Sequence, residues 1–224
     1  MIEVHQVSHR FGERTVLRDV TLRLTERRIG VIGGNGSGKS TFARLLNGLI
    51  TPTRGRVLVD GLDTRTDGKA VRRKVGFVFQ DPDAQIIMPT VAEDVAFGLR
   101  NRGLEPGEVE RRVDAALTDF GLAGHRDHPA HLLSGGQKQL LAVCSALVLE
   151  PSYVVLDEPT TLLDHRNTRT IAKVIRDLPQ RVITVTHDLD LAGDCERVVV
   201  LHDGCVVADA QPHQAIEVYL ERAG

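Results

Sequence analysis

The feature that most constrains this chain is the glycine-rich run at residues 33–40, GGNGSGKS. It fits the pattern G-x-x-x-x-G-K-[ST], in which glycines turn backbone N–H groups onto phosphate oxygens where a side chain would collide. A phosphate-binding loop of this kind joins a buried strand to a helix. An apolar run at 29–32 precedes it and a helical stretch at 41–48 follows it. The run therefore predicts an α/β fold with a triphosphate site, and the alternative is a plain glycine loop.

Two side chains of the loop are expected to act on the bound nucleotide. Lys39 can reach the β- and γ-phosphates, and the Ser40 hydroxyl can ligate Mg²⁺. The positive end of the following helix dipole adds to the anion site. ATP and Mg²⁺ are thus the predicted cofactors. The expected binding residues of the loop are Gly33, Gly34, Asn35, Gly36, Ser37, Gly38, Lys39, Ser40 and Thr41.

Short, wholly apolar runs in the chain have the composition of strands buried on both faces of a parallel sheet. They cover residues 29–32, 75–79, 153–156 and 182–185. Each is directly followed by residues that can bind a ligand or take part in a reaction. These are the glycine loop, Gln80, the pair Asp157 and Glu158, and His187. Ligands of open parallel sheets bind beyond the carboxyl ends of the strands. We therefore expect these strand ends to meet at one site.

The remaining segments are expected to surround that sheet. Alternation with a period of two predicts half-buried strands at 2–4 and 16–24. A hairpin is expected at 198–208, turned at Asp203 and Gly204, and a final helix at about 212–220.

Between about residues 82 and 150 the pattern becomes helical. One helix is expected at 109–120, and another at 137–149, opened by Ser134 as N-cap and ended by Pro151. The sequence thus predicts a single domain over 1–224. Its fold class is α/β, with a mainly parallel core sheet, an N-terminal antiparallel β region and an inserted helical subdomain.

Composition excludes several classes of protein. A net charge of -2 argues against a nucleic-acid binder held by phosphate contacts. The cysteines, Cys144, Cys195 and Cys205, show neither a disulfide framework nor a zinc spacing, so a reducing compartment is expected. The longest apolar run, 140–149, is far shorter than the roughly 20 residues of a membrane-spanning helix. No signal peptide is expected at the start.

Asp157 and Glu158 follow the apolar run at 153–156. One carboxylate there can hold Mg²⁺ through water, and the second can align or deprotonate an attacking water. Acidic residues also occur past strands as helix caps. Downstream of a phosphate-binding loop, the pair favours nucleotide hydrolysis.

The run at residues 133–137, LSGGQ, is called here the signature segment. A small hydroxyl and two glycines at a helix start make a second phosphate cradle. Because one active site needs only one such loop, this cradle is interpreted as serving the γ-phosphate held by another subunit. The alternative is an ordinary capped loop.

The order and rough spacing of these motifs, with Leu163 and Asp164, resemble the ATP-binding cassette (ABC) ATPases over essentially the whole chain. The resemblance implies that Phe11 stacks on adenine and that Gln80 contacts Mg²⁺. It implies that Glu158 acts on water, that His187 contacts the γ-phosphate, and that Asp164 lies across a head-to-tail dimer interface. The residues that it assigns to the opposite subunit's nucleotide are Ser134, Gly135, Gly136 and Gln137. The alternatives are core packing for Phe11 and a satisfied strand-end histidine for His187.

A narrower resemblance is carried by QDPDAQII at 80–87 and EDVAFG at 93–98. These stretches look like ATPase subunits of energy-coupling-factor (ECF) importers, in which the region after the equivalent of Gln80 docks on a coupling helix of the transmembrane subunit. The resemblance implies a second ATPase subunit, in a homodimer, and a substrate-binding membrane subunit as partners. It implies a peripheral place on the cytoplasmic face of the membrane, and no nucleic acid as partner.

Biotin is the expected cargo, with cobalt or nickel as the alternative. Another ABC importer class, or a soluble ABC ATPase acting on DNA or ribosomes, is the rival interpretation. A small-molecule P-loop kinase would leave the signature segment and His187 unexplained.

The chain departs from the family pattern in places. Leu140 and Leu141 follow Gln139 where many relatives carry arginine, and the segment at 161–164, which ends at Asp164, is bulkier than usual. His125, His128 and His131 are spaced as if for a metal on a helix face. Pro129 breaks a helix there, so a metal site is not expected.

Overall fold

The buried strands expected from the sequence lie side by side and parallel in the computed structural model, which describes residues 1–223. The order in this sheet is β10-β9-β3-β8-β7-β6, and only the β9–β10 pair is antiparallel among these neighbours. All of the parallel strands therefore end at one edge, as predicted. Their bounds are β3 (Arg28–Gly33), β6 (Val75–Val78), β7 (Tyr153–Asp157), β8 (Arg181–Val185), β9 (Arg197–His202) and β10 (Cys205–Ala210).

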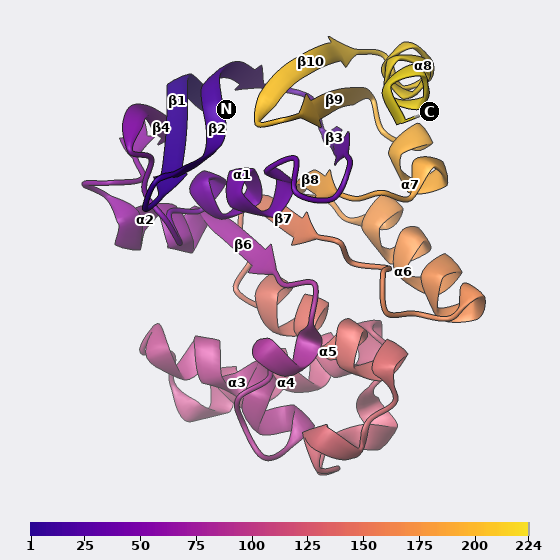
Figure 1. Ribbon diagram of the computed structural model, residues 1–224. Coiled ribbons are helices and arrows are strands. Elements are labelled where there is room, and N and C mark those ends of the chain that lie inside the picture. The colour runs from indigo at the N-terminus through magenta and orange to yellow at the C-terminus, as the bar shows by residue number, and fades with distance from the viewer. Residues whose placement is uncertain (224) are drawn as a thin grey trace.

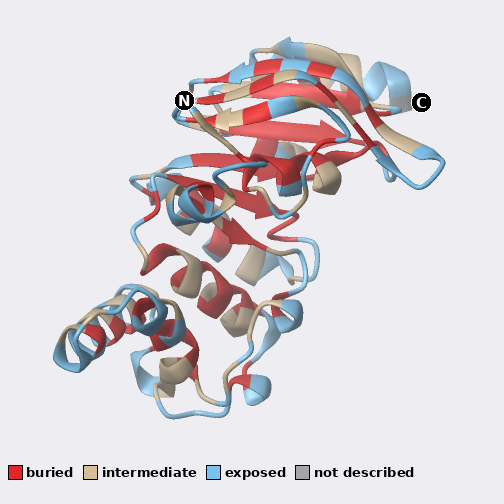
Figure 2. Cartoon of the chain, turned by 90° about the vertical axis from the view of Figure 1, so that its left-hand side faces the viewer, coloured by how far each residue is buried: buried red, intermediate tan, exposed pale blue. Residues whose placement is uncertain are grey.

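A second sheet is antiparallel and N-terminal, also as predicted, with the order β2-β1-β4-β5. It consists of β1 (Ile2–Phe11), β2 (Arg14–Leu24), β4 (Arg54–Val59) and β5 (Leu62–Asp63). Helix α1 (Lys39–Leu46) packs its buried side chains into one core with both sheets, around Phe42. Figure 2 shows this core as buried strands stacked in the upper part of the molecule.

The helical lobe lies below the sheets in Figure 1 and has a hydrophobic cluster of its own. It contains η1 (Pro82–Ala84), α3 (Val91–Asn101), α4 (Pro106–Asp119), η2 (Ala123–His125), η3 (Ala130–Leu132) and α5 (Gly135–Leu147).

The predicted ends of two of these helices were wrong. Helix α4 begins three residues earlier than expected because Pro106 is well suited to the first turn, although the residues after it are polar. Helix α5 begins two residues earlier, directly after its N-cap Ser134, and it ends two residues before position 149. Glu150, with φ of 52°, has already left the helical conformation.

Helices cover the remaining faces of the parallel sheet (Figure 1). The turn between β9 and β10 uses positive φ at Asp203 and Gly204, as the hairpin prediction requires. None of the helices within residues 1–223 has the length and apolar character that crossing a bilayer requires. These covering helices are α2 (Gly68–Lys74), α6 (His165–Asp177), α7 (Leu189–Gly193) and α8 (Pro212–Ala223).

Candidate active site

The glycine-rich loop connects the end of β3 to the start of α1. Gly36 and Gly38 have φ of 79° and 101°, values at which a side chain would be strained. A Cβ atom on Gly38 would lie 2.8 Å from the Leu17 side chain, so the loop sits tightly on β2. No atom lies within 4 Å of a Cβ built on Gly34, which leaves room for a ligand against the backbone. This cradle fits a chain of phosphates.

Lys39 is 7% exposed, and its ammonium donates to the carbonyl oxygens of Gly33 (2.8 Å) and Gly34 (3.1 Å). The ammonium also lies 3.8 Å from Oε1 of Glu158. The cation is therefore held directly over the loop, at the place where phosphate oxygens would need it.

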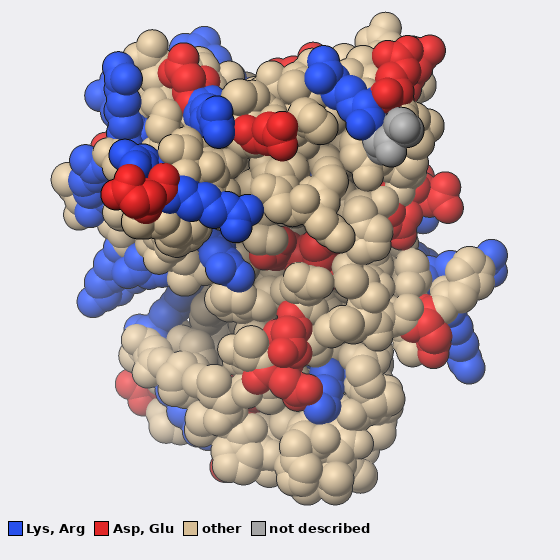
Figure 3. Space-filling model, in the orientation of Figure 1, with Lys and Arg blue, Asp and Glu red and all other residues tan. Residues whose placement is uncertain are grey.

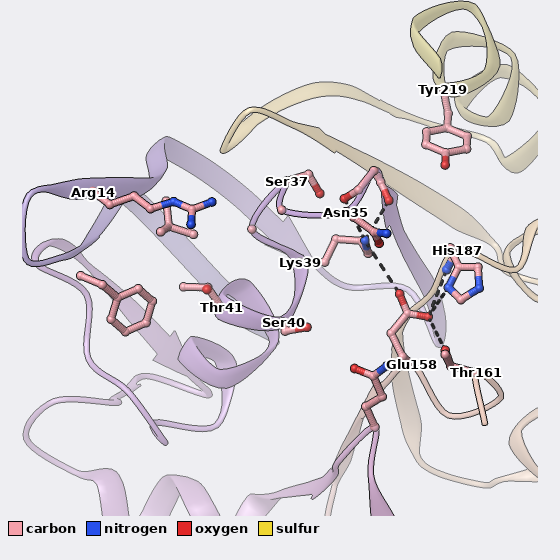
Figure 4. Close-up of a pocket in the computed structure, with 17 residues that line it drawn as sticks. Arg14, Asn35, Ser37, Lys39, Ser40, Thr41, Glu158, Thr161, His187 and Tyr219 are labelled. Carbon is pink, nitrogen blue, oxygen red and sulfur yellow. Dashed lines mark hydrogen bonds and ion pairs between the residues drawn. The ribbon is translucent and has the colours of Figure 1, made fainter. Parts of the chain in front are cut away.

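A pocket of about 790 Å³ opens over this loop, and Figure 4 shows the side chains that line it. Phe11 lies at the pocket and is 53% exposed, with its ring edge-on to His9 at 4.6 Å. The core-packing alternative for Phe11 is therefore wrong. Stacking on adenine stays a prediction. The remaining predicted residues that line the pocket are Gly33, Gly34, Asn35, Gly36, Ser37, Gly38, Lys39, Ser40, Thr41, Gln80, Glu158 and His187.

Sequence reasoning missed several lining residues, including Arg14 and Tyr219. The Arg14 guanidinium lies 3.8 Å from where a Cβ on Gly36 would be, which adds a cation to the phosphate side. Tyr219 projects toward the pocket from α8 (Figure 4). Arg14 could have been predicted to line the pocket, because it lies three residues after Phe11. Nothing near Tyr219 in the sequence signals its position.

Asp157, at the end of β7, is 1% exposed and accepts a hydrogen bond from the Ser40 hydroxyl at 2.9 Å. Burial raises the pKa of this carboxyl above its ordinary value, against the opposing effect of the Ser40 hydrogen bond. A hydroxyl and a carboxylate oxygen are hard donors of the kind Mg²⁺ prefers. Ser40 and Gln80 line the pocket, whereas Asp157 is not one of the lining residues and is linked to them by its hydrogen bond with Ser40. These three donors fit a magnesium ion between nucleotide and protein.

Glu158 is 7% exposed and has φ of 52°. Its Oε2 accepts hydrogen bonds from the Thr161 hydroxyl (3.1 Å) and the His187 backbone N–H (3.3 Å), and it lies 2.8 Å from Nδ1 of His187. Figure 4 shows these groups converging beside Lys39. The structure thus fixes one carboxylate oxygen. The N-cap of the next helix is Asp164, so neither Asp157 nor Glu158 is a helix cap.

The signature segment is placed elsewhere. Ser134 caps α5 in a reciprocal capping box with Gln137. Asp164 caps α6 and accepts a hydrogen bond from the backbone N–H of Asn167 at 2.8 Å. Among the described residues that line the pocket, none belongs to 133–137, and Asp164 is not one of them. The structure therefore does not bring these predicted residues to the nucleotide pocket of their own chain.

The three histidines of the loop before the signature segment do not gather around a common point for a metal. His125 and His128 pack edge-to-face, with ring centroids 5.2 Å apart. Within residues 1–223 no group of three or more His, Cys, Asp and Glu side chains is arranged to hold a metal ion. The proposed magnesium site uses a hydroxyl, an amide and a single carboxylate, so it is not a cluster of that kind.

Comparison with known proteins gives the family. A family model described as "ABC transporter" matches residues 17–161. An ABC transporter ATP-binding protein of Deinococcus radiodurans is 62% identical over 222 residues, covering 99% of this chain and 98% of the relative. The biotin transport ATP-binding protein BioM of Rhizobium etli is 50% identical over 213 residues, covering 95% of each.

A solved structure shows the same fold. It is cbiO1 from Clostridium perfringens, described as part of the ABC transporter complex cbiONQ. Its TM-score against this chain is 0.85 at 34% sequence identity, and the match covers 99% of this chain and 93% of that one.

Proposed function

This chain belongs to the ABC transporter ATPases and hydrolyses ATP to drive transport, and we propose that it powers an energy-coupling-factor importer of biotin. The observation that carries the chemical part is the Glu158 carboxylate, fixed by His187 and Thr161 beside the ammonium of Lys39. The 50% identity to a biotin transport ATPase supports the cargo. The name of the relative at 62% identity specifies no substrate.

The glycine loop would bind the nucleotide. Its backbone N–H groups at the start of α1 would hold the phosphates, with Lys39 as their buried cation. Phe11 would cover the adenine with its exposed ring, and Arg14 would add positive charge on the phosphate side, near Gly36. These contacts position the triphosphate without reacting with it.

Ser40, Asp157 and Gln80 would hold the magnesium ion. When bound, it supplies positive charge to the phosphate oxygens. The hydrogen bond between Ser40 and Asp157 places both oxygens in advance, and burial of Asp157 keeps competing water away. The raised pKa of Asp157 means that this carboxyl keeps its proton to a higher pH than an exposed carboxyl does.

Glu158 would orient the attacking water and accept its proton. Oε2 is occupied by Thr161 and His187, which leaves Oε1, on the Lys39 side, as the oxygen that faces the phosphates. The His187 side chain lines the pocket and is 54% exposed. It can therefore hold Glu158 with Nδ1 and reach a γ-phosphate with the other ring nitrogen.

We propose that the full site needs a second copy, arranged head-to-tail. The support is that the signature segment and Asp164 do not line the pocket of their own chain, although Ser134 opens a helix with an anion-binding start. In such a dimer Ser134 and Gly136 would contact the γ-phosphate held by the other subunit, and Gly135 and Gln137 would complete the cradle around that nucleotide. Asp164 would lie across the interface.

We propose that a transmembrane coupling subunit docks on the helical lobe, which would place the protein on the cytoplasmic face of the membrane. Ile87 is 62% exposed and Phe97 is 40% exposed, apolar side chains that a partner would cover. Buried Asp94 anchors the first of them, because it accepts hydrogen bonds from the backbone N–H groups of Ile87 and Met88. In Figure 3 the visible face of this lobe is mostly uncharged, whereas Lys and Arg gather over the sheets above.

The docking segment at 80–87 is tied to the signature helix α5. The Gln85 amide accepts from the Phe79 backbone N–H at 3.0 Å and donates to the Ala142 carbonyl at 2.8 Å. Asp83 pairs with Lys138 at 2.7 Å. We propose that residues 1–224 work as one ATPase domain. The helical part at about 82–150 would be the subdomain that transmits closure of the dimer to the membrane partner.

Uptake by a reconstituted transporter tests the cargo. The chain would be expressed with the multi-span proteins encoded beside its gene, in a host that lacks biotin uptake. Labelled biotin should enter with this chain and should not enter with Glu158→Gln. Uptake of Co²⁺ or Ni²⁺ instead would assign the cobalt or nickel alternative. The absence of any multi-span neighbour would contradict the importer proposal.

A further inference from the structure

His125 reaches the signature segment, although Gln137 lies twelve positions further along the chain. Nε2 of His125 lies 2.9 Å from Nε2 of Gln137. The same Gln137 side chain accepts a hydrogen bond through Oε1 from the backbone N–H of Ser134, at 2.9 Å. A single amide thus connects the imidazole to the residue that opens the signature helix.

The hydrogen-bond network fixes which group donates. Oε1 of Gln137 has to face Ser134, because the backbone N–H there can only donate. The amide nitrogen of Gln137 therefore faces His125, and it too can only donate. Nε2 of His125 must supply the lone pair, so the ring is neutral, with its proton on Nδ1.

The surroundings of His125 agree with a neutral ring. Nδ1 is buried and has no hydrogen-bond partner within residues 1–223. A charged imidazolium would present an N–H donor to the donating amide of Gln137. The N–H at Nδ1 lacks a partner in either state, but burying it costs more when the ring is charged. Turning the Gln137 amide over would not help, because its nitrogen would then face the Ser134 N–H.

We infer that His125 is a positioning residue, which holds the Gln137 amide so that the first turn of α5 is ready to bind phosphate. Gln137 has a flexible side chain, and without an acceptor at position 125 its amide would leave the Ser134 N–H for part of the time. The Ser134 Oγ accepts from the Gln137 N–H at 3.4 Å, so its own hydrogen stays free to donate. The inference rests on the proposed role of Ser134 at the second subunit's nucleotide.

The first test compares two side chains that both fill the space of the imidazole. His125→Phe removes the acceptor, whereas His125→Gln carries an oxygen close to the place of Nε2. We expect His125→Phe to lower kcat about three- to tenfold, the range for loss of one hydrogen bond. ATP affinity should be unchanged, and His125→Gln should restore most of kcat. His131→Phe, an exposed neighbour, is the control. Equal loss in His125→Phe and His125→Gln would overturn the inference.

A double-mutant cycle tests whether the effect passes through Gln137. In a Gln137→Met background, His125→Phe should have no further effect on kcat. If the two substitutions instead reduced kcat by the product of their separate effects, His125 would act independently of Gln137, which overturns the inference.

Amide hydrogen exchange gives a readout that does not depend on activity. The Ser134 amide should exchange several-fold faster in His125→Phe and at the wild-type rate in His125→Gln. Unchanged exchange would overturn the inference. If Ser134→Arg stays active, the proposed role of the signature segment at the second subunit's nucleotide is wrong, but the inference about His125 is not affected. The exchange result still decides whether His125 positions Gln137.

Discussion

The side-chain amide of Asn167, on α6, fills the space in which a side chain at position 136 would have to lie. A Cβ built on Gly136 would be 2.4 Å from Cγ of Asn167. Asn167 is itself fixed by Asp164, which accepts from its backbone N–H at 2.8 Å and its side-chain amide at 3.1 Å. A side chain at position 136 would therefore have to push the Asn167 amide away from Asp164, a packing cost that is separate from the phosphate contact proposed for Gly136.

Gly136→Ala should therefore destabilise the protein by about 1–3 kcal/mol, the usual range for an overpacked site. Gly135→Ala is the matched control, because nothing lies within 4 Å of a Cβ at that position. It should be neutral or slightly stabilising, as alanine favours a helix. Asn167→Ala in the Gly136→Ala chain should restore most of the loss. Urea unfolding measures each variant, and equal stability of the two alanine variants would contradict the packing argument.

Glu158→Gln should keep ATP binding and abolish turnover. The amide fits the same place between Thr161 and His187 but has no charge with which to polarise water or accept its proton. Trapped ATP should then hold two copies together. Gel filtration with Mg-ATP measures the dimer, with the nucleotide-free variant as control. A species that stays monomeric at high protein concentration would count against the proposed dimer.

Lys39→Ala should weaken nucleotide binding itself, by about tenfold or more. The triphosphate loses a buried cation that Gly33 and Gly34 hold in place. Calorimetry with ATP measures the affinity, and Lys138→Ala, outside the pocket lining, is the control. Normal ATP affinity in Lys39→Ala would falsify the placement of the phosphates.

Asp157→Asn should raise the thermal stability of the nucleotide-free protein at neutral pH. Burial raises the pKa of this carboxyl in the folded state, so the charged form is disfavoured there. The resulting loss of stability is absent below the ordinary pKa of 3.8 and develops as the pH rises from that value through the raised pKa. Each kcal/mol regained would shift Tm by about 2–4 °C. The gain should vanish toward pH 4, and a gain that does not depend on pH would contradict this explanation.

The same substitution should remove most of the stabilisation that Mg-ATP confers over ATP alone. The asparagine side chain could still accept the hydrogen bond of Ser40, but it would bring no charge to the ion. Thermal shifts with and without Mg²⁺ measure the difference. An undiminished magnesium effect would place the ion elsewhere.

The sequence could predict those features of the structure that are determined by residues close together in the chain. The buried strands and the glycine loop were predicted correctly because apolar runs and turn residues act over a few positions. The start of α4 was missed because Pro106 opens it with polar residues, which show no apolar period. The contacts of His125 with Gln137, of Asn167 with Gly136, and of Tyr219 with the pocket join distant segments. Only the packing of the folded chain creates them.

The last prediction concerns the proposed nucleotide site that two subunits would share. If Ser134 and Gly136 serve the nucleotide of the opposite subunit, Ser134→Arg should leave ATP binding by a single subunit nearly intact. It should block hydrolysis, because the long side chain fills the space that the γ-phosphate needs in the closed dimer. Calorimetry and ATPase assays on this variant measure the two effects.

Mixing Ser134→Arg with Lys39→Ala decides between the two arrangements. In a mixed dimer one site pairs an intact Lys39 with an intact Ser134, and the other site carries both defects. Each variant alone should be inactive, yet the mixture should recover part of the ATPase activity. If Ser134 acted within its own subunit, every site would carry one defect and nothing would recover. Strict coupling of the two sites would also prevent recovery of activity. Crosslinking Ser134→Cys of one subunit to Ser40→Cys of the other distinguishes strict coupling from action within one subunit, because only the head-to-tail dimer brings the two positions together.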